Sequence, residues 1–203
     1  PGVIAPDIMQ HYGVSGSELS FIATFYFIGY AGMQLPAGML FDKFGPRKLL
    51  CVATLFCAFG TLIFATASHF QWLLIARFIT GLGSSFAFLG ALVLAANWFP
   101  AKRFAMLNGG VITLGMFGAI FGEKPLALMV NALGWQKSML YLGIAGFGLA
   151  LLLFLVIRDR PKGIREQHVP VKGKALLASL WLILKHPKSW LVALYGALMY
   201  GPT

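Results

Sequence analysis

Long apolar runs alternate with short charged stretches along the whole chain. Five of these runs are about 20 residues long or more, which is the length that an α-helix needs to cross roughly 30 Å of hydrocarbon. Residues 1–17 are too few and too polar to cross, and the apolar stretch at 189–203 has only 15 residues. We interpret both ends as parts of further spans. The predicted full spans are at about 18–41, 48–68, 71–96, 104–124 and 137–157.

The composition is that of a membrane protein. Hydrophobic residues make up 59% of the 203 residues and charged residues 11%, whereas soluble domains are about 45–50% apolar and about 25% charged. We therefore predict an all-α integral membrane protein. The net charge of +10 does not indicate a nucleic-acid partner, because the basic residues are dispersed between apolar runs. Cys51 and Cys57 turn away from each other on a helix, so we expect neither a disulfide nor a metal site there. We also expect no cofactor.

Basic residues are unevenly divided between the two sets of connections. The connections at 42–48, 97–103 and 158–188 contain thirteen of the sixteen Lys and Arg residues, and the alternate connections contain only Lys124 and Lys137. The positive-inside rule places the basic set in the cytoplasm. We therefore expect a multi-pass protein of a plasma membrane, such as the bacterial inner membrane.

The basic connection at 158–188 divides into a linker and a helix. Its first part is polar and contains Pro and Gly, which is typical of a linker. Its second part, at about 174–185, has an amphipathic pattern that predicts a short helix. Two interpretations stay open: the helix lies in the membrane interface, or it packs on protein. Its apolar positions are Leu176, Leu180, Trp181 and Leu184.

Part of the sequence recurs after an interval of 89 residues. Because this interval contains three predicted spans, the second copy enters the membrane from the opposite side. Inverted three-helix repeats of this kind are typical of secondary transporters. The matched pairs are Gly29 with Gly118, Gln34 with Glu123, Pro36 with Pro125, Asp42 with Asn131, Gly45 with Gly134 and Lys48 with Lys137.

Two sequence motifs of this chain resemble motifs of the major facilitator superfamily. The stretch GMLFDKFGPRK is similar to the G-x-L-x-D-[RK]-x-G-[RK]-[RK] loop between helices 2 and 3, and RFITGLG is similar to the R-x-x-x-G-x-G motif of helix 4. The resemblance spans the chain. It implies the N-terminal half of a carrier, from the end of helix 1 to the start of helix 7, and a missing C-terminal half. The matching residues are Gly38, Leu40, Asp42, Lys43, Gly45, Arg47 and Lys48, followed by Arg77, Gly81 and Gly83.

The motif loop has three predicted roles. Gly38 and Gly45 permit a tight cytoplasmic turn. Arg47 and Lys48 fix the orientation and meet anionic headgroups. Asp42 gains nothing from the positive-inside rule, so it needs a cation or a helix N-terminus as partner. The resemblance implies that this acid contacts the other half and stabilises one conformation of the alternating-access cycle. A solvated acid in a turn is the alternative.

Arg77 is the costliest residue of the predicted spans, because it lies about five residues, or roughly 8 Å, inside the outer end of helix 4. The resemblance implies a role in substrate or proton coupling. A structural arginine bonded to nearby carbonyls is the alternative. We predict that its small, polar face looks into the bundle and that an aromatic face looks toward lipid. The first face has Thr80, Gly81, Ser84 and Phe88, and the second has Phe78, Leu82, Phe86 and Leu89.

Helix 5 argues against a drug carrier. Gly109, Gly118 and Gly122 have the spacing of the drug/proton antiporter motif of the same family. That motif has a proline directly after its glycine, whereas Glu123 follows Gly122 here. The connection at 97–103 is loosely similar to that of metabolite and anion carriers.

Polar residues of helices 2 and 5 complete the candidate site. Glu123 and Lys124, at the expected outer mouth, form a gate pair or two solvated interfacial charges, and the second interpretation is favoured. The remaining candidates are Gln34, Asn108 and Thr113.

These observations favour a secondary active transporter of a small metabolite, an organic anion or an amino-acid-like compound, that works by alternating access. Its expected partners are the substrate, a proton or sodium ion as in a symporter, the lipid bilayer and the missing half. A membrane-embedded enzyme is disfavoured, because the chain has no His-Glu-x-x-His or Gly-x-Gly-Asp motif and no paired intramembrane acids. Two alternatives stay open: a structural or regulatory membrane piece, since one half cannot close a pathway alone, and a drug/proton antiporter.

Overall fold

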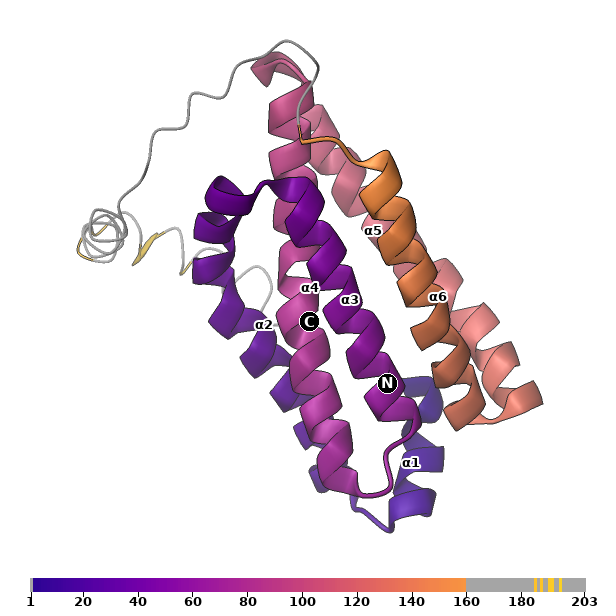
Figure 1. The fold of residues 1–203 in the computed structure, drawn as a ribbon. Helices are drawn as coiled ribbons and strands as arrows, with labels where there is room; N and C mark the ends of the chain where they lie inside the picture. Colours follow the sequence, from indigo (N-terminus) through magenta and orange to yellow (C-terminus); the bar gives the residue numbers. More distant parts are fainter. Residues whose placement is uncertain (1, 160–184, 186, 188–189, 192–193, 195–203) are drawn as a thin grey trace. The chain divides into compact units, whose positions relative to one another are not determined.

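The computed structural model describes residues 2–159, together with five residues of the C-terminal segment (Figure 1). The chain divides into two compact units, Pro1–Lys162 and Gly163–Thr203. Apart from those five residues, the predicted helix at 174–185 and the predicted span at 189–203 lie outside the described residues. The five described residues of the second unit are helical, and they are Lys185, Pro187, Trp190, Leu191 and Leu194.

The described part of the first unit consists of helices and contains no strand, which confirms the predicted all-α architecture. A 3-10 turn, Gly2–Ile4, comes first. The helices that follow are α1 (Ala5–Tyr12), α2 (Gly16–Phe44), α3 (Pro46–Ala65), α4 (Phe70–Trp98), α5 (Ala101–Leu133) and α6 (Trp135–Val156).

Helix α4 lies at the centre of the bundle. It packs against α2 and against α3, while α6 packs on α3 and α5 contacts α4 and α6 (Figure 1). The two glycines of the helix 4 motif make these approaches possible on opposite sides of α4. A β-carbon at Gly83 would lie 2.5 Å from the carbonyl oxygen of Ala53 in α3, and one at Gly81 would collide with the Tyr26 carbonyl in α2. Both positions therefore require glycine for close helix packing.

The two junctions of the internal repeat have the same backbone geometry. Gly45 joins α2 to α3 with φ 76° and ψ 160°, and Gly134 joins α5 to α6 with φ 82° and ψ 159°. A proline lies inside each preceding helix, Pro36 in α2 and Pro125 in α5. Figure 1 shows the two junctions at opposite ends of the bundle. The structure therefore agrees with an inverted repeat, as the 89-residue interval predicts.

Helix α5 is longer than the predicted span at 104–124, since it continues to Leu133, and α6 begins at Trp135. Most of the predicted outer connection is thus helical. The predicted span ended at 124 because Glu123 and Lys124 are charged. In the structure the helix continues past both residues, and their side chains are exposed on its surface. The helix also continues through Pro125, because membrane helices tolerate proline where neighbouring groups satisfy the freed backbone carbonyl.

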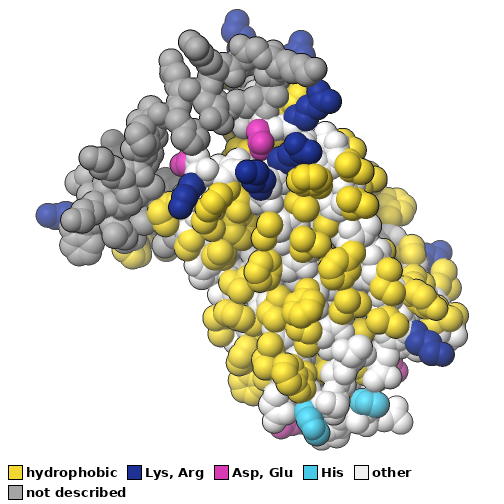
Figure 2. Space-filling view, in the orientation of Figure 1, with side chains coloured by type: hydrophobic (Ala, Val, Ile, Leu, Met, Phe, Trp, Pro, Cys, Tyr) yellow, Lys and Arg dark blue, Asp and Glu magenta, His cyan; other side chains and the backbone are white. Residues whose placement is uncertain are grey.

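Helices α3, α4, α5 and α6 are long and apolar enough to cross a membrane. Helix α2, with 29 residues, is also long enough, and it contains serine, threonine, tyrosine and glutamine side chains among its apolar ones. Large hydrophobic side chains are exposed over the bundle (Figure 2). This apolar surface and these helices identify a membrane-embedded protein.

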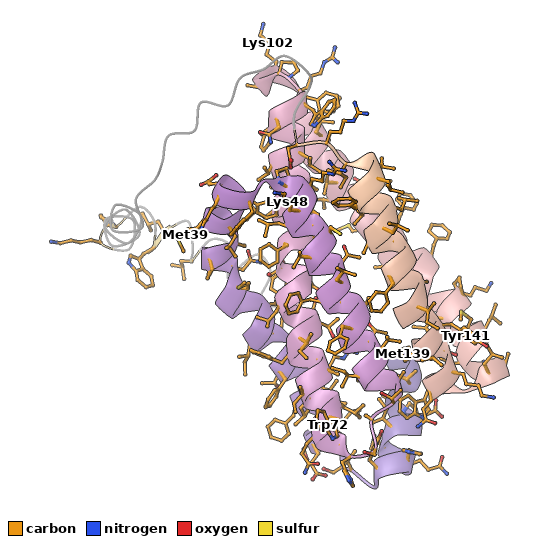
Figure 3. The ribbon with its side chains drawn as sticks, viewed as in Figure 1. Met39, Lys48, Trp72, Lys102, Met139 and Tyr141 are labelled. Carbon is orange, nitrogen blue, oxygen red and sulfur yellow. The ribbon has the colours of Figure 1, made fainter. Side chains whose placement is uncertain are left out.

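Basic side chains gather where α2 meets α3 and α4 meets α5, which we call the basic end (Figure 2). Figure 3 shows Lys48 and Lys102 at this end, with Trp72 toward the opposite end. The grouping follows from the helix order, because the basic connections alternate along the chain. The cytoplasmic location of the basic end stays a prediction from the positive-inside rule. Its residues are Lys43, Arg47, Lys48, Lys102, Arg103 and Arg158.

Candidate functional site

Arg77 lies inside the bundle near the end opposite the basic end. It follows the first residue of α4, Phe70, by seven positions, or about 10 Å along the helix. Its side chain is half-buried, and its Nε atom is buried without a hydrogen-bond partner. The guanidinium carbon lies 5.1 Å from the centre of the Phe64 ring of α3. Among the described residues, no ion pair to this guanidinium is present.

Two cavities meet at Arg77. The larger, of about 240 Å³, lies between α4 and the helices α1 and α2. The smaller, of about 40 Å³, lies on the side of α3 and α6. Arg77 therefore supplies the positive charge of both cavities. Besides Arg77, the larger is lined by Gly2, Ala5, Ile8, Leu19, Ser20, Ile22 and Ala23, and the smaller by Thr61, Phe64, Thr80 and Met139.

The hydroxyls predicted beside Arg77 bond to the helix itself. Thr80 donates to the carbonyl oxygen of Ala76, and Ser84 donates to that of Thr80 at 2.8 Å. Ser84 Oγ also lies 3.6 Å from Cys57 Sγ of α3. Thr80 lines the small cavity together with Arg77. Of the polar candidates on α4, Thr80 is thus the one that the structure brings to the same cavity.

The predicted division of α4 into an inner and a lipid face is wrong at two positions. Phe86, assigned to lipid, is only 6% exposed and contacts Phe41 of α2 with ring centres 5.7 Å apart. Phe88, assigned to the interior, is 44% exposed. The reason is that α4 is covered on two sides, by α2 and by α3. A helix that is buried on two sides does not show one apolar stripe.

The motif loop is shorter than its sequence pattern predicts. Asp42 and Lys43 belong to the last turn of α2, and Arg47 and Lys48 belong to the first turn of α3. Gly45 alone forms the turn between them, with a positive φ that favours glycine. The prediction that Gly38 helps form the turn is wrong, because Gly38 lies inside α2, where a side chain would meet nothing within 4 Å.

Arg47 is held by the end of α6. Its backbone amide donates to Asp159 Oδ1 at 2.7 Å, and its Nε atom donates to the carbonyl oxygen of Phe154 at 2.9 Å. Its guanidinium carbon also lies 4.4 Å from the centre of the Phe154 ring. Asp159 thus places a carboxylate at the N-terminus of α3, where free amides and the helix dipole favour a negative charge. In this structure Arg47 contacts α6, whereas the sequence prediction turned it toward headgroups.

The same segment also joins the end of α4. Asn97 Nδ2 donates to the carbonyl oxygen of Asp159 at 3.1 Å, and Trp98 Nε1 donates to that of Arg158 at 2.9 Å. Our sequence reasoning missed Asn97, Trp98 and Asp159 because it placed them in loops. One signal was available: Asp159 is an acid at the start of a strongly basic connection.

Asp42 and the other polar candidates lie outside these contacts. Asp42 is exposed and forms no hydrogen bond or ion pair with the part of the chain that the structure describes. Glu123 and Lys124 are exposed neighbours on α5, and adjacent helical positions do not face each other. Gln34 and Thr113 are exposed as well, and Asn108 has a buried Oδ1 atom without a partner.

Comparison with known proteins gives one family. The family model described as "Major Facilitator Superfamily" matches residues 1–203. The relatives include a protein of Cupriavidus necator named "Probable sulfoacetate transporter", 29% identical over 86% of this chain and 40% of its own length. They also include the 4-hydroxybenzoate transporter of Pseudomonas putida, 31% identical over 78% of this chain and 38% of its own length.

A third relative is the nitrate/nitrite transporter of Nostoc punctiforme, 27% identical over 89% of this chain and 36% of its own length. The chain therefore spans about two fifths of the length of these curated relatives.

Proposed function

This chain belongs to the major facilitator superfamily, and we propose that the whole protein is a secondary transporter that moves a small organic anion across the membrane by alternating access. We propose alternating access because of the inverted repeat, whose junctions at Gly45 and Gly134 have nearly the same backbone dihedral angles. Such repeats let one bundle rock against another around a central site.

The observation that supports an anionic substrate is the positive charge of Arg77. A cation inside a membrane protein is costly unless an anion or a polar cavity compensates it. Within the described residues no carboxylate pairs with Arg77, and its Nε atom has no hydrogen-bond partner. A substrate carboxylate or sulfonate in the adjoining cavity would supply the missing counter-charge. The solutes in the names of the three relatives, sulfoacetate, 4-hydroxybenzoate and nitrate, are anions at neutral pH, which supports this substrate class.

Coupling to a cation follows from the membrane potential. Moving one negative charge toward the negative interior costs about 2.3 kcal/mol per 100 mV. We therefore propose symport of the anion with protons or sodium ions. In a bacterial inner membrane the basic end would face the cytoplasm. Asp42, which is exposed at that end, would contact the second six-helix half of the transporter.

The test is a thermal-shift titration of the purified full-length protein. The solutes are sulfoacetate, 4-hydroxybenzoate and nitrate, with neutral glucose and cationic lysine as controls. A solute at 100 times its dissociation constant stabilises the fold by about 2.7 kcal/mol. We expect anions to raise the melting temperature and Arg77→Gln to remove that rise. Equal stabilisation by glucose or lysine, or an undiminished rise in Arg77→Gln, would contradict the anion site.

A further inference from the structure

Arg77 is supported by an aromatic ring in a place where a carboxylate would be the usual partner. Its guanidinium carbon lies 5.1 Å from the centre of the Phe64 ring, which is within the range of a cation–π interaction. Both side chains line the small cavity, and Arg77 reaches the larger cavity on the other side of α4. The ring therefore contacts the cation on one side while the other side is open to a ligand.

The Phe64 ring is itself held firmly. It is only 4% exposed, and its centre lies 6.1 Å from that of Trp135 in a T-shaped arrangement. Trp135, the first residue of α6, is 7% exposed and contacts Tyr12 of α1. The Tyr12 hydroxyl in turn donates to the carbonyl oxygen of Ala67 at 2.7 Å. Three helices thus fix the ring, so its position does not depend on a ligand.

The choice of a ring over an acid has a chemical consequence. A carboxylate beside Arg77 would neutralise it and compete with an anionic substrate for the same guanidinium donors. The quadrupole of a phenyl ring attracts the cation but removes none of its charge and uses none of its N–H donors. A ring partner therefore orients the guanidinium and leaves its charge and its planar fork free.

We propose that Phe64 is the positioning residue of the anion site: its ring holds the Arg77 guanidinium in place by cation–π contact, so that the substrate is the counter-charge of Arg77. This inference rests on the proposed function, and it adds a specific requirement. The residue at position 64 has to be aromatic and electron-rich, whereas a core position needs only apolar volume.

The experiment replaces Phe64 in the full-length protein by leucine and, through an expanded genetic code, by 3,4,5-trifluorophenylalanine. Fluorination weakens the ring quadrupole at nearly constant volume. The matched control is Phe59→Leu, because Phe59 lies on the same helix but is 55% exposed. Dissociation constants for sulfoacetate, 4-hydroxybenzoate and nitrate are measured by thermal-shift titration, and KM and kcat by uptake into proteoliposomes.

Phe64→Leu is expected to weaken anion binding about tenfold and to raise KM more than it lowers kcat. The fluorinated ring should weaken binding in the same direction with an unchanged melting temperature of the ligand-free protein, and Phe59→Leu should bind normally. If the fluorinated protein binds anions as the parent does, Phe64 only fills the core and the inference is wrong. If none of the three anions stabilises the parent, the proposed function fails first and the inference with it.

Discussion

The backbone amide of Arg47 and the carboxylate of Asp159 are joined by a 2.7 Å hydrogen bond, although 112 positions separate them in the chain. The bond fixes the first turn of α3 to the segment that follows α6. Arg47 Nε strengthens the link by donating to the carbonyl oxygen of Phe154. The α2–α3 junction, with Asp42 one turn before it, is therefore held within this half of the protein, and Asp42 is presented from a fixed position.

The first prediction tests the Asp159 cap. Asp159→Ala should lower the stability of the full-length protein by about 1 kcal/mol, the typical value for a lost N-terminal cap, as measured by thermal unfolding in detergent. Arg158→Ala is the matched control, because the exposed Arg158 contributes only its carbonyl oxygen to the contact with Trp98. Equal melting temperatures for the two variants would show that the cap contributes nothing.

The second prediction concerns close packing around α4. Gly81→Ala should reduce the yield of folded protein and its melting temperature, because the new methyl group would collide with the Tyr26 backbone of α2. Overpacking of this kind costs about 1–3 kcal/mol. Gly148→Ala on α6, where a β-carbon meets nothing within 4 Å, should behave as the parent does. An unaffected Gly81→Ala variant would mean that α2 and α4 are farther apart in the membrane.

The all-α architecture of residues 2–159 and the inverted pairing of its two glycine junctions could be predicted because they depend on local features. Apolar length sets the spans, and the 89-residue recurrence relates Gly45 to Gly134, which do have the same backbone geometry. The contacts of Asp159 with Arg47 and of Phe64 with Arg77 could not be predicted, because they depend on which helices become neighbours. The burial of Phe86 was missed for the same reason, since a helix covered on two sides has no single inner face.

The third prediction concerns orientation in the membrane. Phe44 and Leu133 are 45% and 44% exposed and lie near opposite ends of the bundle. In a background without Cys51 and Cys57, Leu133→Cys should react with an impermeant thiol reagent in intact cells, whereas Phe44→Cys should react only after permeabilisation. The positive-inside rule places position 44 in the cytoplasm. Labelling of position 44 from outside would reverse the assigned orientation.

The fourth prediction tests whether Asp42 contacts the other half of the transporter or is a solvated surface residue. If Asp42 contacts the other half, Asp42→Asn should reach the membrane at the parental level and lose most uptake activity. Its anion affinity should be unchanged, because Asp42 lies at the basic end, away from the Arg77 cavities. Uptake into cells and thermal-shift binding are measured on the same variant. Parental uptake would leave Asp42 as a solvated residue at the end of α2.

The last prediction separates a functional Arg77 from a structural one. Arg77→Lys keeps the positive charge but replaces the planar five-donor guanidinium by a compact ammonium group. Arg77 forms no hydrogen bond or ion pair with the described residues, and its Nε atom is buried without a partner, so the exchange breaks no hydrogen bond or ion pair among them. Arg77→Lys should therefore reach the membrane at a near-parental level and with a near-parental melting temperature.

Transport by Arg77→Lys should nevertheless fall, because lysine cannot offer an anion two parallel N–H donors and charge-assisted bidentate bonds are the strongest available. We expect KM for the anion to rise at least tenfold in proteoliposome uptake, a change of about 1.4 kcal/mol. Arg103→Lys, an exposed exchange at the basic end, is the matched control and should transport normally. A structural arginine would give the opposite pattern: Arg77→Lys would aggregate or be degraded, and the molecules that remained would transport with parental KM.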